Sequence, residues 1–128
     1  MQQVFDLPKI GQMAKYIDAL GHKDPAMKFI ELGAGSGAMT DFCMKTLTTD
    51  ASGQIKPSCY KQWDFTDLSS SFFPQAQDLF AAQGEKMRFM TLDIEQDPET
   101  QGFECGTYDV VVAFLVSLKY FMLVMKAL

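Results

Sequence analysis

The chain has 128 residues, 48% of them hydrophobic and 21% charged, a balance typical of one folded domain and unlike that of a disordered segment. Its net charge of −5, without a cluster of basic residues, argues against nucleic acid as a partner, because phosphate binding requires grouped lysines and arginines. The cysteines Cys43, Cys59 and Cys105 include no Cys-x-x-Cys pair. We therefore expect no zinc site or disulfide framework, and we expect a cytoplasmic protein without a signal peptide.

The first half of the chain predicts a helix, a strand and a second helix. Apolar residues recur at helical spacing over 11–20, and Gly21 favours the end of this helix. Residues 28–32 predict a short strand that leads directly into a glycine-rich loop. A second helix is expected over 38–47, and 48–58, which is rich in turn-forming residues, predicts a surface loop.

The second half predicts strands over 60–66, 87–92 and 108–114, with a helix between the first two. Pro74 suits the first turn of that helix, and Gly84 suits its C-terminal end. The last of these strands is continuously apolar, as expected of a strand buried on both faces. Strands that alternate with helices predict a parallel sheet with right-handed crossovers, so we expect an α/β, Rossmann-like doubly wound fold.

The end of the sequence, residues 110–128, is apolar except for Ser117, Lys119 and Lys126. A run of this length is compatible with a membrane span, but a lysine near its middle is costly in a bilayer. We expect instead a buried strand that continues into an apolar tail, and no membrane partner.

The segment Glu31-Leu-Gly33-Ala34-Gly35-Ser-Gly37 joins the first expected strand to the following helix. Glycines at such a turn permit positive φ and let a ligand come close to the backbone. The helix that follows directs its free N–H groups and its dipole toward that ligand. We interpret the segment as the binding loop of a nucleotide cofactor.

Two kinds of cofactor fit this loop. Gly33, Gly35 and Ala38 match the dinucleotide pattern Gly-x-Gly-x-x-Gly/Ala, so an NAD(P)-dependent reductase is one alternative. The third glycine at Gly37 and the acidic Glu31 before the loop favour S-adenosylmethionine instead. A carboxylate suits the sulfonium and amino groups of that cofactor better than it suits a pyrophosphate.

Acidic residues also follow the next two strands. Asp67 is placed to accept hydrogen bonds from ribose hydroxyls, and Asp93 is placed to accept one from the adenine amino group. Their neighbours Leu68 and Ile94 are the expected apolar contacts, with Ile94 packing on the ring. A role as a turn residue or helix cap is the alternative for each aspartate. Asp64 lies within the strand pattern and is interpreted as an edge residue.

Four linked motifs carry a family resemblance, and they occur in the order Phe29-Ile-Glu-Leu-Gly-Ala-Gly-Ser-Gly37, Phe65-Thr-Asp-Leu-Ser-Ser-Ser-Phe-Phe73, Leu92-Asp-Ile-Glu-Gln-Asp-Pro98 and Gln101-Gly-Phe-Glu-Cys-Gly-Thr-Tyr-Asp109. Over residues 11–113 the chain resembles the C-methyltransferase domain of fungal highly reducing polyketide synthases, of the methyltransferase type 12 kind. The resemblance implies a class I methyltransferase fold and S-adenosylmethionine as cofactor. It also implies methyl transfer to the α-carbon of a β-ketoacyl chain held on an acyl carrier protein.

The sequence departs from this family where the resemblance places the catalytic base. The family's Asn-Val-Leu-His-Ala-like segment reads Leu115-Val-Ser-Leu-Lys119 here, so Leu118 stands at the histidine position. A leucine cannot accept a proton, and we therefore assign no catalytic residue. His22, the only histidine, is expected on the surface, in the loop before the first strand.

The resemblance suggests a front half with about four strands and without the later strands of the fold. We expect a helical lead-in over 1–27, a cofactor-binding core over 28–114 and an apolar tail over 115–128. The last strand would then be an apolar edge that favours self-association, unless the tail covers it as a helix. We accordingly expect a fragment with impaired catalysis, and a non-catalytic module that binds cofactor or a partner is the alternative.

Overall fold

The centre of the molecule is a parallel sheet, as the sequence predicts, and its strands lie in the order β5-β2-β3-β4. The computed structural model describes residues 2–6, 10–104, 106–115 and 120–125. The four parallel strands are β2 (Lys28–Leu32), β3 (Gln62–Asp67), β4 (Met87–Thr91) and β5 (Val110–Leu115). Each begins and ends close to the range expected from its apolar pattern.

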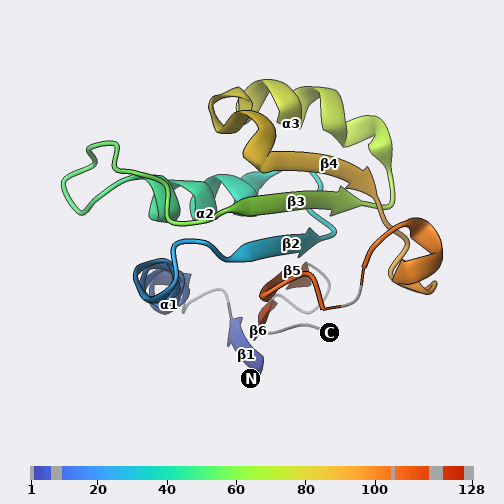
Figure 1. Cartoon of the computed structure of the whole chain (residues 1–128), viewed down its shortest axis with the longest axis horizontal. Coiled ribbons are helices and arrows are strands. Elements are labelled where there is room, and N and C mark those ends of the chain that lie inside the picture. The colour runs from blue at the N-terminus through green and yellow to red at the C-terminus, as the bar shows by residue number, and fades with distance from the viewer. Residues whose placement is uncertain (1, 7–9, 105, 116–119, 126–128) are drawn as a thin grey trace.

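Two further strands extend this sheet beyond β5 (Figure 1). Strand β6 (Tyr120–Met125) pairs antiparallel with β5 along its whole length, and β1 (Gln2–Asp6) pairs antiparallel with β6. The expectations that β5 would be an edge and that the tail would cover it as a helix are therefore wrong. The sequence did not reveal β6 because residues 110–128 contain no glycine, proline, asparagine or aspartate to mark a turn.

Helices cover one face of the parallel strands (Figure 1). They are α1 (Ile10–Lys23), α2 (Ala38–Thr48) and α3 (Phe73–Leu79). Short 3-10 turns lie at Ser70–Phe72 and Ala81–Lys86 on either side of α3, and another lies at Pro98–Gln101 between β4 and β5. Their apolar sides join one core with the strand residues of that face, where the rings of Phe29 and Trp63 stack 5.1 Å apart. Within the described ranges, none of the helices has the length and apolarity needed to span a membrane.

Helix α1 continues past Gly21, where the sequence predicted its end. A Cβ atom on Gly21 would lie 2.7 Å from the Cβ of Cys59, so α1 passes too close to that residue for a larger side chain. Gly21 therefore permits close packing and does not terminate the helix. As a consequence, His22 lies in the last turn of α1 and not in a loop, although its side chain is exposed as expected.

The opposite face of the sheet carries a smaller apolar cluster of Ile30, Leu92, Phe103 and Tyr108. The connection from β4 returns across the sheet and places β5 on the other side of β2. The direction of winding thus reverses at β2, and ligands of such sheets bind beyond the carboxyl ends of the strands at this point. Asp64 is fully buried in β3, an internal strand, so its interpretation as an edge residue is wrong.

Candidate functional site

The glycine-rich loop connects β2 to α2 at the carboxyl edge of the sheet. Gly33, Gly35 and Gly37 have φ angles of 62°, 57° and 86°, which confirms the conformational reason for glycine at these positions. A Cβ atom added at Gly33 or Gly35 would approach no atom closer than 4.0 Å in the described part of the chain. This side of the loop is open, and a ligand can reach the backbone there.

Gly37 differs from the other two glycines because it packs against the core. Its added Cβ would lie 2.9 Å from Cε2 of the buried Phe80 ring. We expect Gly37→Ala to lower the free energy of unfolding by about 2 kcal/mol, through backbone strain and overpacking together. Urea titration measures the loss. Gly53→Ala, at a φ of 83° but with no atom within 4 Å, is the matched control and should cost less. Equal losses would contradict a packing role for Gly37.

Asp67 joins the loop to the end of β3. Its Oδ2 accepts the Gly35 N–H at 2.9 Å, and its Oδ1 accepts the Ser69 N–H at 3.0 Å. A second contact runs from the Ala34 N–H to the carbonyl oxygen of Thr66, at 2.9 Å. The Asp67 carboxylate therefore lies at the rim of the open loop, where it also forms the local turn that was its alternative role.

The end of β4 brings Asp93 to the same edge. The Leu92 N–H donates to the carbonyl oxygen of Asp67 at 3.0 Å, which places the segment after β4 beside the end of β3. Asp93 Oδ1 accepts the backbone N–H two residues later at 3.0 Å, so Asp93 also forms a turn. Leu68 and Ile94 are 70% and 66% exposed. Two exposed apolar side chains beside two carboxylates suit a ligand with a flat ring and hydroxyl groups.

Glu31 lies beneath the loop and not at the open edge with the other predicted residues. Its side chain is 1% exposed, and its Oε1 accepts hydrogen bonds from the Thr40 hydroxyl and, at 3.2 Å, from Trp63 Nε1. The pKa of Glu31 is raised from 4.5 to about 7, mainly by burial and to a smaller extent by the nearby Asp67, while these two bonds act in the lowering direction. Glu31 therefore connects β2 to α2 and β3.

Thr40 and Trp63 are site-supporting residues that the sequence analysis missed. Thr40 follows the loop in the first turn of α2. A threonine there is common in helices, so the apolar spacing of α2 gives no sign that its hydroxyl supports the site. The apolar residues around Trp63 in the sequence indicate only a core position. The structure adds the hydrogen bond from its ring N–H to Glu31. Leu118, which stands at the position of the family's catalytic histidine, lies outside the described residues.

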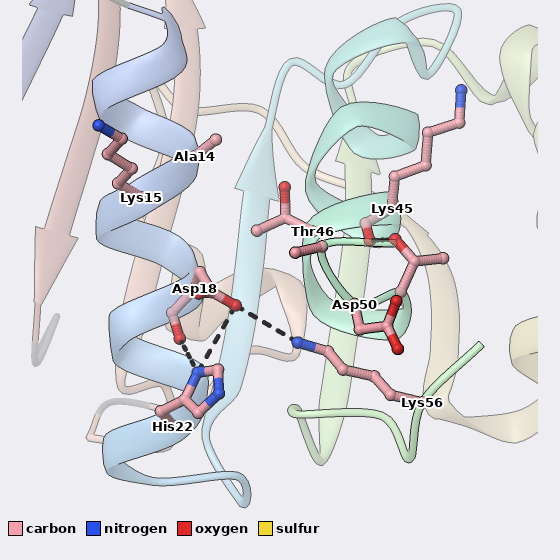
Figure 2. A pocket seen from close by; sticks show the side chains of 10 residues that line it. Ala14, Lys15, Asp18, His22, Lys45, Thr46, Asp50 and Lys56 are labelled. Atoms are coloured by element: carbon pink, nitrogen blue, oxygen red, sulfur yellow. Dashed lines mark hydrogen bonds and ion pairs between the residues drawn. The ribbon is translucent and has the colours of Figure 1, made fainter. Parts of the chain in front are cut away.

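A groove of about 540 Å³ lies between α1, α2 and the loop that follows α2 (Figure 2). Three of its charged or titratable side chains are close together: Asp18 Oδ1 lies 3.3 Å from Lys56 Nζ and 3.5 Å from His22 Nδ1. Lys45 Nζ lies 2.8 Å from Asp41 Oδ2. The groove is at the C-terminal end of α2, whereas the glycine loop precedes its N-terminal end. His22 therefore lies away from the site formed by the strand ends.

Curated relatives of the chain are large fungal synthases, although no protein-family model matches it. The chain is 48% identical over 106 residues to a highly reducing polyketide synthase of Aspergillus terreus, and this match covers 83% of the chain and 4% of the synthase. It is 46% identical over 102 residues to the squalestatin tetraketide synthase of Phoma sp., covering 80% of the chain and 4% of that protein. The compactin diketide synthase of Penicillium citrinum is 45% identical over 102 residues, with the same coverage of 80% and 4%. The chain thus spans about 4% of the length of these relatives.

Solved structures that resemble the chain include two methyltransferases. The trans-methyltransferase CalH, in complex with SAH, is 37% identical with a TM-score of 0.72, over 80% of the chain and 27% of CalH. The CurJ carbon methyltransferase is 33% identical with a TM-score of 0.55, over 69% of the chain and 21% of CurJ. The chain is therefore homologous to a segment of the fungal highly reducing polyketide synthases and has the Rossmann-like fold of class I methyltransferases.

Proposed function

We propose that the chain binds S-adenosylmethionine at the carboxyl edge of β2, β3 and β4, as the cofactor-binding part of a methyltransferase in polyketide biosynthesis. The observation that carries the proposal is the contact of the Asp67 carboxylate with the Gly35 N–H. It holds a negative charge at the rim of the open loop, which suits a cationic ligand and ribose hydroxyls. The same charge would repel a pyrophosphate, and it already occupies a loop N–H group that a pyrophosphate would use.

Each residue at this edge has a part in the proposed binding. Gly33, Ala34, Gly35 and Gly37 form the loop against which the cofactor lies, Asp67 accepts from the ribose hydroxyls, Asp93 accepts from the adenine amino group, and Leu68 and Ile94 pack on the adenine ring. The exposure of both apolar side chains supports this assignment. The presence of SAH in the related CalH structure supports the choice of cofactor.

The proposed reaction is methylation of the α-carbon of a β-ketoacyl chain on an acyl carrier protein, in the cytosol. The polyketide synthase homologues and the carbon methyltransferase neighbours support this substrate class. When bound, S-adenosylmethionine supplies the methyl group, and the substrate α-carbon must lose a proton to a base. The described cysteines, Cys43 and Cys59, are free thiols, which suits a reducing compartment.

Calorimetric titration of the chain with S-adenosylmethionine tests the proposal. We expect binding, and we expect Asp67→Ala to weaken it about tenfold or more, because a charged hydrogen-bond acceptor is lost. Asp18→Ala removes an equal charge in the distant groove and should leave the affinity unchanged. Binding of NADPH without binding of S-adenosylmethionine would select the reductase alternative and overturn the proposal.

A second candidate function is cofactor binding without catalysis. The presence of Leu118, where the resemblance places a histidine, favours it, because leucine cannot accept the substrate proton. Incubation of the chain with labelled S-adenosylmethionine and a β-ketoacyl thioester decides between the two. Methyl transfer to the thioester would exclude the non-catalytic function, and binding without transfer would select it.

A further inference from the structure

Glu31 is the buried centre of a polar network directly under the glycine loop. Its Oε1 accepts from Thr40 in α2 and Trp63 in β3, while its own carbonyl oxygen accepts the Thr66 hydroxyl at 2.6 Å. Thr66 in turn holds the loop through its carbonyl oxygen, which accepts the Ala34 N–H. Glu31 thus links β2 and β3, two of the three strands whose ends form the proposed site, to the helix that follows the loop.

The surroundings of Glu31 contain no compensating cation among the described residues. None of the ion pairs among the described residues involves Glu31. On β3 the Asp67 carboxylate helps to raise the pKa of Glu31. On α2 the titratable group near it is the fully buried Cys43, whose own pKa is raised by burial and by Glu31. On β5 its partner in register is the apolar Val112. A carboxyl group in this position gains a proton more readily than an exposed one, because burial and a neighbouring anion both disfavour its charge.

The electrostatic effect of the Asp67 carboxylate on Glu31 gives the direction in which a charge at the rim of the loop acts on the network beneath it. A negative charge at the rim disfavours ionisation of Glu31. A positive charge bound at the same rim must act in the opposite direction through the same low-dielectric interior.

We propose that Glu31 releases a proton to solvent when a cationic ligand binds over the glycine loop, so that binding at this site depends on pH near neutrality. This inference rests on the proposed function, with S-adenosylmethionine as the ligand. Its sulfonium gives that cofactor one positive charge more than S-adenosylhomocysteine (SAH), in which the sulfur is neutral. The two ligands therefore differ in charge at nearly constant shape.

Calorimetric titrations at pH 7 in phosphate and in Tris buffer measure the protons released, because the two buffers differ in ionisation enthalpy. If the cation shifts the ionisation of Glu31 by about one pH unit, S-adenosylmethionine should release about 0.4 proton. Its affinity should then rise about fivefold between pH 6 and pH 8. SAH should release distinctly less and bind with a flatter pH profile.

Two variants assign the proton to Glu31. Glu31→Gln keeps a carbonyl oxygen for Thr40 and Trp63 but cannot ionise, so it should bind S-adenosylmethionine without the difference between buffers. Asp18→Asn, in the distant groove, should release as many protons as the parent chain. If Glu31→Gln does not fold, the comparison of the two ligands on the parent chain still decides.

The possible failures are distinguishable. Binding of both ligands with equal proton release, or with none, would overturn this inference and leave the proposed function standing. Proton release that persists in Glu31→Gln would also overturn it. If neither ligand binds, the proposed function fails and the inference fails with it.

Discussion

Arg88→Met should lower the free energy of unfolding by about 3 kcal/mol, because it leaves the Asp64 carboxylate buried without its cation. Asp64 is fully buried in β3, and Arg88 on β4 meets it with two parallel bonds, Nε to Oδ1 at 2.8 Å and Nη2 to Oδ2 at 2.7 Å. Tyr108 and Gln62 also donate to this carboxylate, the latter at 3.1 Å. The loss is measured by urea titration at pH 7.

The matched control for this prediction is Lys45→Met. Lys45 forms an ion pair with Asp41 across one turn of α2, with both side chains substantially exposed, so its loss should have a far smaller effect. The double variant Asp64→Leu/Arg88→Met should recover part of the stability, since an apolar pair needs no charge compensation. If Arg88→Met were as mild as Lys45→Met, the buried carboxylate would not depend on Arg88.

In the parent chain the free energy of unfolding should fall by on the order of 3 kcal/mol as pH rises, because of Glu31, and Glu31→Gln should abolish this fall. The pKa of Glu31 is raised by burial from 4.5 to about 7, so between these values the folded state holds a proton that the unfolded state has lost. Stability therefore falls as pH rises from 4.5 to about 7, and the loss is complete above about 7. Glutamine carries no titratable proton, so the variant lacks this slope.

The measurement is the difference in unfolding free energy between Glu31→Gln and the parent chain at several pH values from 4.5 to 8. The unfolding free energy of the variant should rise relative to that of the parent as pH increases across this range. A constant difference between the two, caused by the substitution itself, does not affect this trend. A difference that is independent of pH would show that Glu31 is already ionised in the folded state at pH 5.

The fold was predictable where local patterns and packing agree. The strand over 28–32 and the helix from residue 38 were expected from apolar spacing around three glycines, and both are confirmed. Gly21 shows the limit of such patterns. It was expected to end a helix, and only the 2.7 Å approach of its Cβ position to Cys59 reveals that it permits packing.

The sequence predicted which residues lie at the edge of the sheet, but not which of them is buried beneath the loop. Asp67 and Asp93 follow parallel strands, and carboxyl ends of parallel strands share one edge, so their place at the sheet edge follows from topology. Glu31 precedes the loop by two residues and was grouped with them. Whether its side chain points outward or into the core depends on residues outside its own strand. Here hydrogen bonds from Trp63 on β3 and Thr40 on α2 hold the carboxyl group in the core.

The amino-acid sequence by itself determined the parallel βαβ core and the glycine loop, because glycine spacing and apolar periodicity act over a few residues. The tertiary structure alone decided three features: β6 covers β5, Asp64 is buried with Arg88, and Glu31 is a buried acid beneath the loop. Each depends on contacts between segments far apart in the chain. Strand pairing, burial and the electrostatics of a carboxyl group are set by such neighbours, which no local pattern records.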